Sequence, residues 1–116
     1  MRTSNKNLSP SLNKQIKSTF FQAITDLKNV EEVQKFFSDF FTDSEIEVFS
    51  KRLAIAYWLK KRRSYSNIKN NLKVSSATIA TVQSLMDKSG FQLALKKIEA
   101  EEWATQWTEK IKKFIK

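Results

Sequence analysis

Apolar residues recur every three or four positions through most of the chain, a spacing that gathers them on one face of an α-helix. Residues 11–27 carry one such stripe, and residues 30–41 carry a second, shorter one. The apolar residues of these two segments are Leu12, Ile16, Phe20, Ile24, Leu27, Val30, Val33, Phe36, Phe37, Phe40 and Phe41. The pattern predicts two amphipathic helices at the start of the chain.

A third helix is expected to begin at residues 42–45, which read Thr-Asp-Ser-Glu. This is a capping box, in which the threonine hydroxyl and the glutamate carboxylate each accept a hydrogen bond from a free amide at a helix start. Its buried stripe would consist of Ile46, Phe49, Leu53, Ala56 and Leu59. The following Lys-Lys-Arg-Arg run, residues 60–63, would lie at the negative end of the helix dipole. Dipole matching explains two of these charges well and four less well.

The segment 64–86 divides into two short helices around Leu72-Lys73-Val74. Ser64 can cap the first helix and Ser75 the second, because a serine hydroxyl accepts a hydrogen bond from the first turn. Val74 would fill the angle between the two helices. Their inner faces would carry Tyr65, Ile68, Leu72, Ile79, Val82 and Met86. Two short helices joined by a tight turn predict a helix-turn-helix at 64–86.

The rest of the chain is expected to hold a flexible arm and a last helix. Residues 1–9 are polar, basic and without periodicity, whereas residues 10–116 are expected to form a single helical domain. Gly90 would act as a helix C-cap or hinge before a C-terminal amphipathic helix at 91–115. Trp103 and Trp107 lie one turn apart in that helix and are expected to make core or dimer contacts rather than stack on a ligand.

Composition supports an all-α fold of about six helices. The chain holds one Gly and one Pro, which leaves little material for hairpin turns. It also holds nine Phe, and Phe21, Phe37 and Phe41 lie beside the main stripes rather than on them. Later helices of the same chain could cover these rings, but an intertwined homodimer supplies apolar area more economically.

The charge balance favours a polyanionic partner. Lys and Arg number 21 against 12 Asp and Glu, a formal charge of +9. Such an excess suits a phosphate-binding surface, although it also suits an anionic membrane face or a soluble protein without such a partner. The expected partner is double-stranded DNA.

The residue types present argue against an enzyme. Cys and His are absent, which removes thiolate chemistry, imidazole bases and the usual zinc ligands. The acids are spread along amphipathic segments, so they are interpreted as solvated helix faces. We expect no cofactor. Without a secretory signal or a long apolar span, we expect no membrane contact and a cytoplasmic location.

The proposed helix pair assigns distinct roles to its residues. The second helix would present short residues to base edges in the major groove, namely Ser75, Ser76, Ala77, Thr78, Ala80 and Thr81. The DNA phosphates would be contacted by Lys60, Lys61, Arg62, Arg63, Ser64, Lys69 and Lys73. An ordinary helix hairpin is the competing interpretation, but it explains less well why the second helix carries so little charge.

Residues 36–83 resemble the tryptophan-repressor superfamily. The similarity lies in a Thr-x-x-Glu helix start (Thr42, Glu45) with an Arg ten residues after the Thr (Arg52), and in the motifs Ser-Tyr-x-x-Ile and Ser-x-Ala-Thr-Ile. The Ser-Tyr and Ser-Ser-Ala-Thr-Ile motifs look closest to those of the YerC/YecD-like branch of this superfamily. The resemblance implies an intertwined homodimer with two helix-turn-helix units facing successive major grooves.

The resemblance also raises the question of a corepressor. It implies an effector pocket that includes Thr42 and Arg52. The sensing members of the superfamily hold tryptophan with a second Arg, and Thr81 occupies that position here, followed by Val82 where they have Gly. A hydroxyl cannot pair with a carboxylate and stack on an indole as a guanidinium does. This argues against tryptophan as the corepressor, whereas another small molecule is still compatible with the sequence. Lys73 stands at a turn position that usually holds Gly, so it requires either a left-handed Lys or a different turn.

Three functions are compatible with these observations. The leading one is a sequence-specific regulator of transcription that binds DNA as a dimer. The second is an architectural DNA-binding protein with little base discrimination, and the third is a helical protein-interaction module whose charge is incidental.

Overall fold

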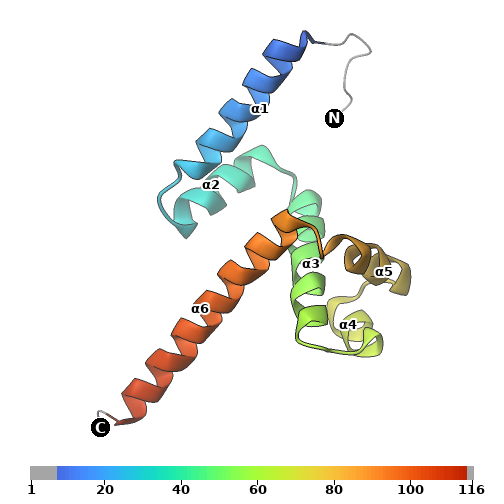
Figure 1. The fold of residues 1–116 in the computed structure, drawn as a ribbon, viewed down its shortest axis with the longest axis vertical. Coiled ribbons are helices and arrows are strands. Elements are labelled where there is room, and N and C mark those ends of the chain that lie inside the picture. Colours follow the sequence, from blue (N-terminus) through green and yellow to red (C-terminus); the bar gives the residue numbers. More distant parts are fainter. Residues whose placement is uncertain (1–7, 115–116) are drawn as a thin grey trace. The chain divides into compact units, whose positions relative to one another are not determined.

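The computed structural model describes residues 8–114, with the side chains of Ala104 and residues 106–114 left out. Within that range the chain forms six helices and no strand (Figure 1). The helices are α1 (Pro10–Thr25), α2 (Val30–Phe40), α3 (Asp43–Lys60), α4 (Tyr65–Leu72), α5 (Ser76–Leu85) and α6 (Ser89–Phe114). The predicted all-α class is confirmed. The arm predicted over residues 1–9 falls almost entirely outside the described residues.

Internal contacts divide the chain into two units, Met1–Ile46 and Glu47–Lys116. We call these the N-terminal unit and the C-terminal unit. The boundary falls inside α3, and each unit is described by itself. A single folding domain over residues 10–116 stays a prediction.

The N-terminal unit consists of two capped helices and the first turn of α3. Ser9 accepts a hydrogen bond from Leu12 N at the start of α1, and Asn29 accepts one from Glu32 N at the start of α2. Neither α1 nor α2 contains a buried residue. These helices therefore start where local caps direct them, but they do not enclose a core.

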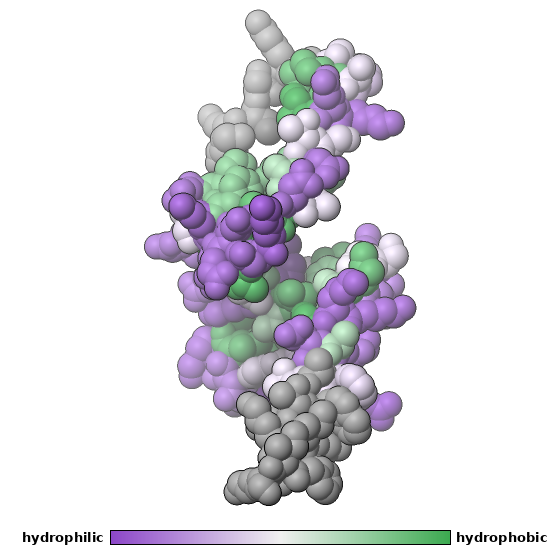
Figure 2. All heavy atoms as spheres, turned by 90° about the vertical axis from the view of Figure 1, so that its left-hand side faces the viewer, coloured by the Kyte–Doolittle hydropathy of each residue, from purple (hydrophilic) through white to green (hydrophobic). Residues whose placement is uncertain are grey.

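Aromatic rings hold α1 and α2 together. The Phe20 and Phe40 ring centroids lie 5.5 Å apart across the two helices, and Phe36 stacks on Phe40 at 5.0 Å. Further ring contacts involve Phe21, Phe37 and Phe41. Even so, Phe21 is 62% and Phe40 57% exposed. Figure 2 shows green apolar surface lying open on this unit beside purple polar patches.

The predicted capping box at the start of α3 is present. Thr42 N donates to Glu45 Oε1 at 2.9 Å, and Glu45 N donates to Thr42 Oγ1 at 3.1 Å. Bonds from the backbone and then from the side chain of Thr42 hold the pKa of the Glu45 carboxyl below its usual range. The box therefore contributes stability at pH values above the ordinary pKa of glutamate, and this contribution is lost as the pH falls through the lowered pKa.

The core lies in the C-terminal unit. Six hydrophobic residues are buried there, from α3, α4, α5 and α6: Ile55, Ala56, Ile68, Ile79, Val82 and Leu95. Leu72, Val74 and Met86 pack against them, together with Trp58 of α3. This core fixes α4 and α5 against α3.

The sequence prediction for Gly90 is wrong. Gly90 is the second residue of α6 and has no positive φ, so it neither caps nor hinges a helix. The helix α5 instead ends at Leu85, with Met86 as its C-cap in a right-handed conformation. Because α6 begins at Ser89, the glycine falls within its first turn.

Candidate nucleic-acid interface

The two short helices expected within 64–86 are α4 and α5, and serine caps start both. Ser64 Oγ accepts a hydrogen bond from Asn67 N at 3.1 Å, and Ser75 Oγ accepts one from Thr78 N at 3.1 Å. Both cap residues have an extended backbone. Local sequence therefore determines where each helix of the pair begins.

Packing and one polar contact fix the angle between α4 and α5. Ile68 of α4 is buried, as are Ile79 and Val82 of α5. At the outer edge, the Tyr65 hydroxyl donates a hydrogen bond to Gln83 Oε1, which joins the start of α4 to α5. The pair is thus held at its inner face and at its rim.

The outer face of α5 is exposed and carries no charge. All six proposed base-reading residues are exposed: Ser75, Ser76, Ala77, Thr78, Ala80 and Thr81. Thr81 Oγ1 donates to Ala77 O at 3.0 Å, and the Ser75 and Thr78 hydroxyls lie 2.9 Å apart. Ser76 makes no side-chain hydrogen bond within the described part of the chain. Its hydroxyl is therefore available to an outside partner both as donor and as acceptor.

The end of α3 has the bonding pattern of a Schellman motif. Arg62 N donates to Leu59 O at 2.9 Å, and Arg63 N donates to Trp58 O at 3.1 Å. Arg62 has a φ of 63°, the left-handed conformation in which glycine is the usual residue. The Arg63 guanidinium lies 4.2 Å from the centroid of the Trp58 ring, where such motifs commonly have a hydrophobic contact.

The four basic residues at 60–63 do not share one environment. Lys60 Nζ lies 3.1 Å from Glu99 Oε1, and Lys61 Nζ lies 3.3 Å from Glu102 Oε2, both on α6. Arg62 and Arg63 have no ion pair among the side chains that the structure describes. Sequence reasoning missed this division, because the acids that pair with the lysines lie far along the chain.

Two further proposed phosphate residues lie on or next to α4. Lys69 is exposed on the helix, and Lys73 follows its last residue with a φ of 56° and a ψ of 52°. A left-handed lysine is thus the solution the chain adopts at the turn. Lys73 N donates to Lys69 O there, so this helix also ends on a cation where glycine is usual.

A pocket of about 430 Å³ lies between α3 and the start of α5. Its lining residues are Val48, Lys51, Arg52, Ile55, Lys73, Val74, Ser75, Thr78, Thr81 and Val82. Arg52, one of the two residues that the resemblance assigns to an effector pocket, lines this cavity, and three cations line it without an acid. Thr42 does not line it and instead serves the capping box of α3.

The described residues contain no cluster of three or more acids that could hold a metal ion. No helix in residues 8–114 combines the length and the apolar character needed to cross a membrane.

Three comparisons with known proteins indicate which family has this arrangement of helices. Residues 15–99 match the family described as Trp repressor protein. The chain is 31% identical over 84 residues to the uncharacterized protein YerC of Bacillus subtilis (strain 168), which covers 71% of this chain and 81% of YerC. It is also similar to the crystal structure of a TrpR-like protein from Eubacterium eligens ATCC 27750, with a TM-score of 0.70 and 31% identity over 77% of this chain and 94% of that one.

These likenesses agree with the all-helical fold, and the matched residues 15–99 include the motifs at Thr42, Ser64 and Ser75. Together they confirm the resemblance found in the sequence, including its YerC-like branch, and they associate the chain with a regulator fold rather than with an enzyme family. The chain belongs to the Trp repressor family.

Proposed function

We propose that this protein is a sequence-specific transcriptional regulator that binds double-stranded DNA as a homodimer in the cytoplasm. The helix α5 reads the major groove with its N-terminal turn, and α4 crosses the backbone. The observation that carries the proposal is the combination of an exposed, uncharged outer face on α5 with cations at both ends of α4. Ser76 and the methyl groups of Ala77 and Ala80 contact base edges.

The backbone at Arg62 and Lys73 supports this assignment. Both residues adopt left-handed conformations, at φ 63° and φ 56°, which cost a residue with a side chain about 1–2 kcal/mol. Glycine would avoid that cost but would remove a positive charge next to α4. Strained backbone is often retained where function requires the side chain. We interpret the two cations as phosphate contacts, together with Arg63, Ser64 and Lys69.

A homodimer supplies what the N-terminal unit lacks. Its two helices have no buried residue, and Leu12, Ile16 and Phe21 are each more than two-fifths exposed. A second copy covers this apolar surface and gives the molecule two α5 helices. Such a dimer binds a palindromic site with half-sites about one helical turn apart.

The pocket lined by Arg52 is a candidate effector site. Lys51, Arg52 and Lys73 favour an anionic group, and Thr81 provides neither the charge nor the plane of a second guanidinium. We therefore propose an anionic effector other than tryptophan.

Competition against bulk genomic DNA at physiological salt tests the proposed function. A duplex selected from genomic fragments is expected to survive an excess of random duplex, because specific binding commonly exceeds non-specific binding by about 4–10 kcal/mol. Equal displacement by both duplexes would favour an architectural protein. Failure to bind any duplex at low salt would favour a protein-interaction module.

Arg62→Gly is expected to separate DNA binding from folding. Removal of the left-handed side chain stabilises the protein by about 1 kcal/mol, since glycine adopts this conformation without strain. The same change weakens binding to all duplexes and lowers the slope of log K against log salt by about 0.9 for each protomer. Thermal melting and a salt titration measure the two effects.

Arg62→Lys is the matched control, since it keeps both the charge and a side chain. It is expected to bind DNA nearly as the wild type does and to gain no stability. An unchanged salt slope in Arg62→Gly would contradict the assignment of Arg62 to a phosphate.

A further inference from the structure

Two acids on α6 face the basic end of α3. Glu99 and Glu102 are three residues apart, so they lie on one side of the helix. Lys60 is 3.1 Å from the first and Lys61 is 3.3 Å from the second. Both lysines of the Lys-Lys-Arg-Arg run are therefore directed to α6.

Lys61 is held by more than one contact. Its Nζ lies 5.5 Å from the centroid of the Tyr57 ring, and Glu102 Oε2, its ion-pair partner, is shielded from solvent. A carboxylate oxygen away from water depends on a nearby cation.

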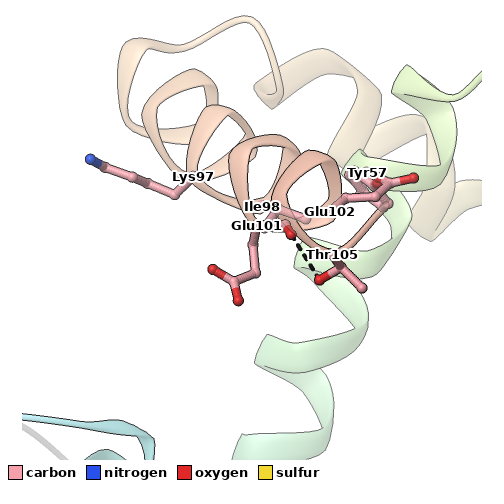
Figure 3. A pocket seen from close by; sticks show the side chains of 6 residues that line it. All are labelled: Tyr57, Lys97, Ile98, Glu101, Glu102 and Thr105. Carbon is pink, nitrogen blue, oxygen red and sulfur yellow. Dashed lines mark hydrogen bonds between the residues drawn. The ribbon is translucent and has the colours of Figure 1, made fainter. Parts of the chain in front are cut away.

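An open pocket of about 700 Å³ lies beside this contact, and Figure 3 shows the residues that line it. Tyr57 comes from α3, whereas Glu101 and Glu102 come from α6. In this view the side chains of Lys97 and Glu101 point away from Tyr57. Neighbouring acids on α6 therefore differ in role, since Glu102 pairs with Lys61, whereas Glu101 has no ion pair with any described side chain.

We propose that Glu99 and Glu102 withhold Lys60 and Lys61 from the DNA backbone, so that Arg62 and Arg63 alone make the phosphate contacts of this run. The inference rests on the proposed DNA binding. To reach a phosphate, each lysine must leave its carboxylate, and the released carboxylate then repels the nearby DNA. Phosphate contacts carry no sequence information, so limiting them lowers the affinity for every duplex. The acids of α6 thereby limit the electrostatic part of DNA binding at a distance from the bases.

The test is the salt dependence of binding to a random-sequence duplex. Glu99→Gln/Glu102→Gln keeps the shape of both side chains and frees both lysines. Its slope of log K against log salt is expected to steepen by about one to two for each protomer, at about 0.9 per phosphate. Its affinity at low salt is expected to rise about 2- to 30-fold for each protomer, which is the range for two partly exposed ion pairs.

Three further variants show whether the lysines cause the gain. Lys60→Gln/Lys61→Gln in the wild type is expected to leave the slope unchanged, and the same pair added to Glu99→Gln/Glu102→Gln is expected to cancel the gain. Glu101→Gln makes a charge change on the same helix without releasing a lysine, so it is expected to have little effect. Thermal melting confirms that each variant is folded.

If the wild-type protein binds DNA but Glu99→Gln/Glu102→Gln has the same salt slope as the wild type, this inference alone is overturned. A similar gain per charge in Glu101→Gln would also overturn it, because the effect would then be one of net charge. Absence of wild-type binding to any duplex would instead overturn the DNA-binding proposal, and this inference with it.

Discussion

Ser76→Glu is expected to reduce strongly the preference for a selected site over random duplex while leaving the fold intact. Ser76 is the first residue of α5, and its hydroxyl is exposed. A carboxylate there faces the acceptor atoms and phosphates of the groove, with a cost of about 1–3 kcal/mol at each half-site. Over two half-sites this weakens specific binding by roughly 30-fold to 10⁴-fold. The folded state does not suffer, because a negative charge at a helix N-terminus is stabilising by about 0.3–1 kcal/mol.

Ser89→Glu is the matched control for this change. Ser89 is likewise an exposed serine at the first residue of a helix, α6, so the charge and the local helix effect are the same. It is expected to retain the preference for the selected site. Competition binding with both variants measures the difference, and a Ser76→Glu protein that prefers the selected site as strongly as the wild type would remove α5 from base reading.

Helix starts in this chain follow from short-range signals, which is why the sequence predicts them well. The capping box of Thr42 and Glu45 and the caps at Ser64 and Ser75 each involve groups three residues apart. A cap of this kind depends little on the rest of the fold. The inner stripe that includes Ile68 and Ile79 is also periodic, so its burial is predictable.

Helix ends are less predictable, because a left-handed residue is not restricted to glycine. The single glycine, Gly90, lies inside α6, whereas Arg62 and Lys73 occupy the left-handed positions. For Lys73 the sequence is compatible with either a left-handed lysine or a different turn. For Arg62 the sequence contains no signal that the residue is left-handed. In both cases the adjacent helices are anchored by Ile55 and Ile68, and this packing holds the strained residue in place.

The candidate interface shows the same division between local and long-range information. The exposure of Ser76 and Ala77 on α5 follows from the periodicity of the helix. The pairing of Lys60 with Glu99 does not, because it depends on how α6 packs against α3. A basic run in a sequence therefore overstates the charge available to DNA.

Phe21→Ser/Phe40→Ser is expected to convert a dimer into monomers or to unfold the N-terminal unit. These rings are 62% and 57% exposed in the single chain, and neither α1 nor α2 contains a buried residue. If a second copy covers them, loss of two rings from each of two protomers removes roughly 4–7 kcal/mol of apolar burial. The dissociation constant then rises about a thousandfold or more. Light-scattering mass across a range of protein concentrations and far-UV circular dichroism measure the effect.

Gln15→Ser/Gln34→Ser is the control, since it shortens an exposed polar residue on each of the same two helices. This variant is expected to keep the mass of the wild-type protein. The dimer and DNA binding should then fail together in the phenylalanine variant, because a monomer presents a single α5 and contacts one half-site. Wild-type mass in the phenylalanine variant, or a wild-type protein that is monomeric at micromolar concentration, would show that a second copy does not cover these rings.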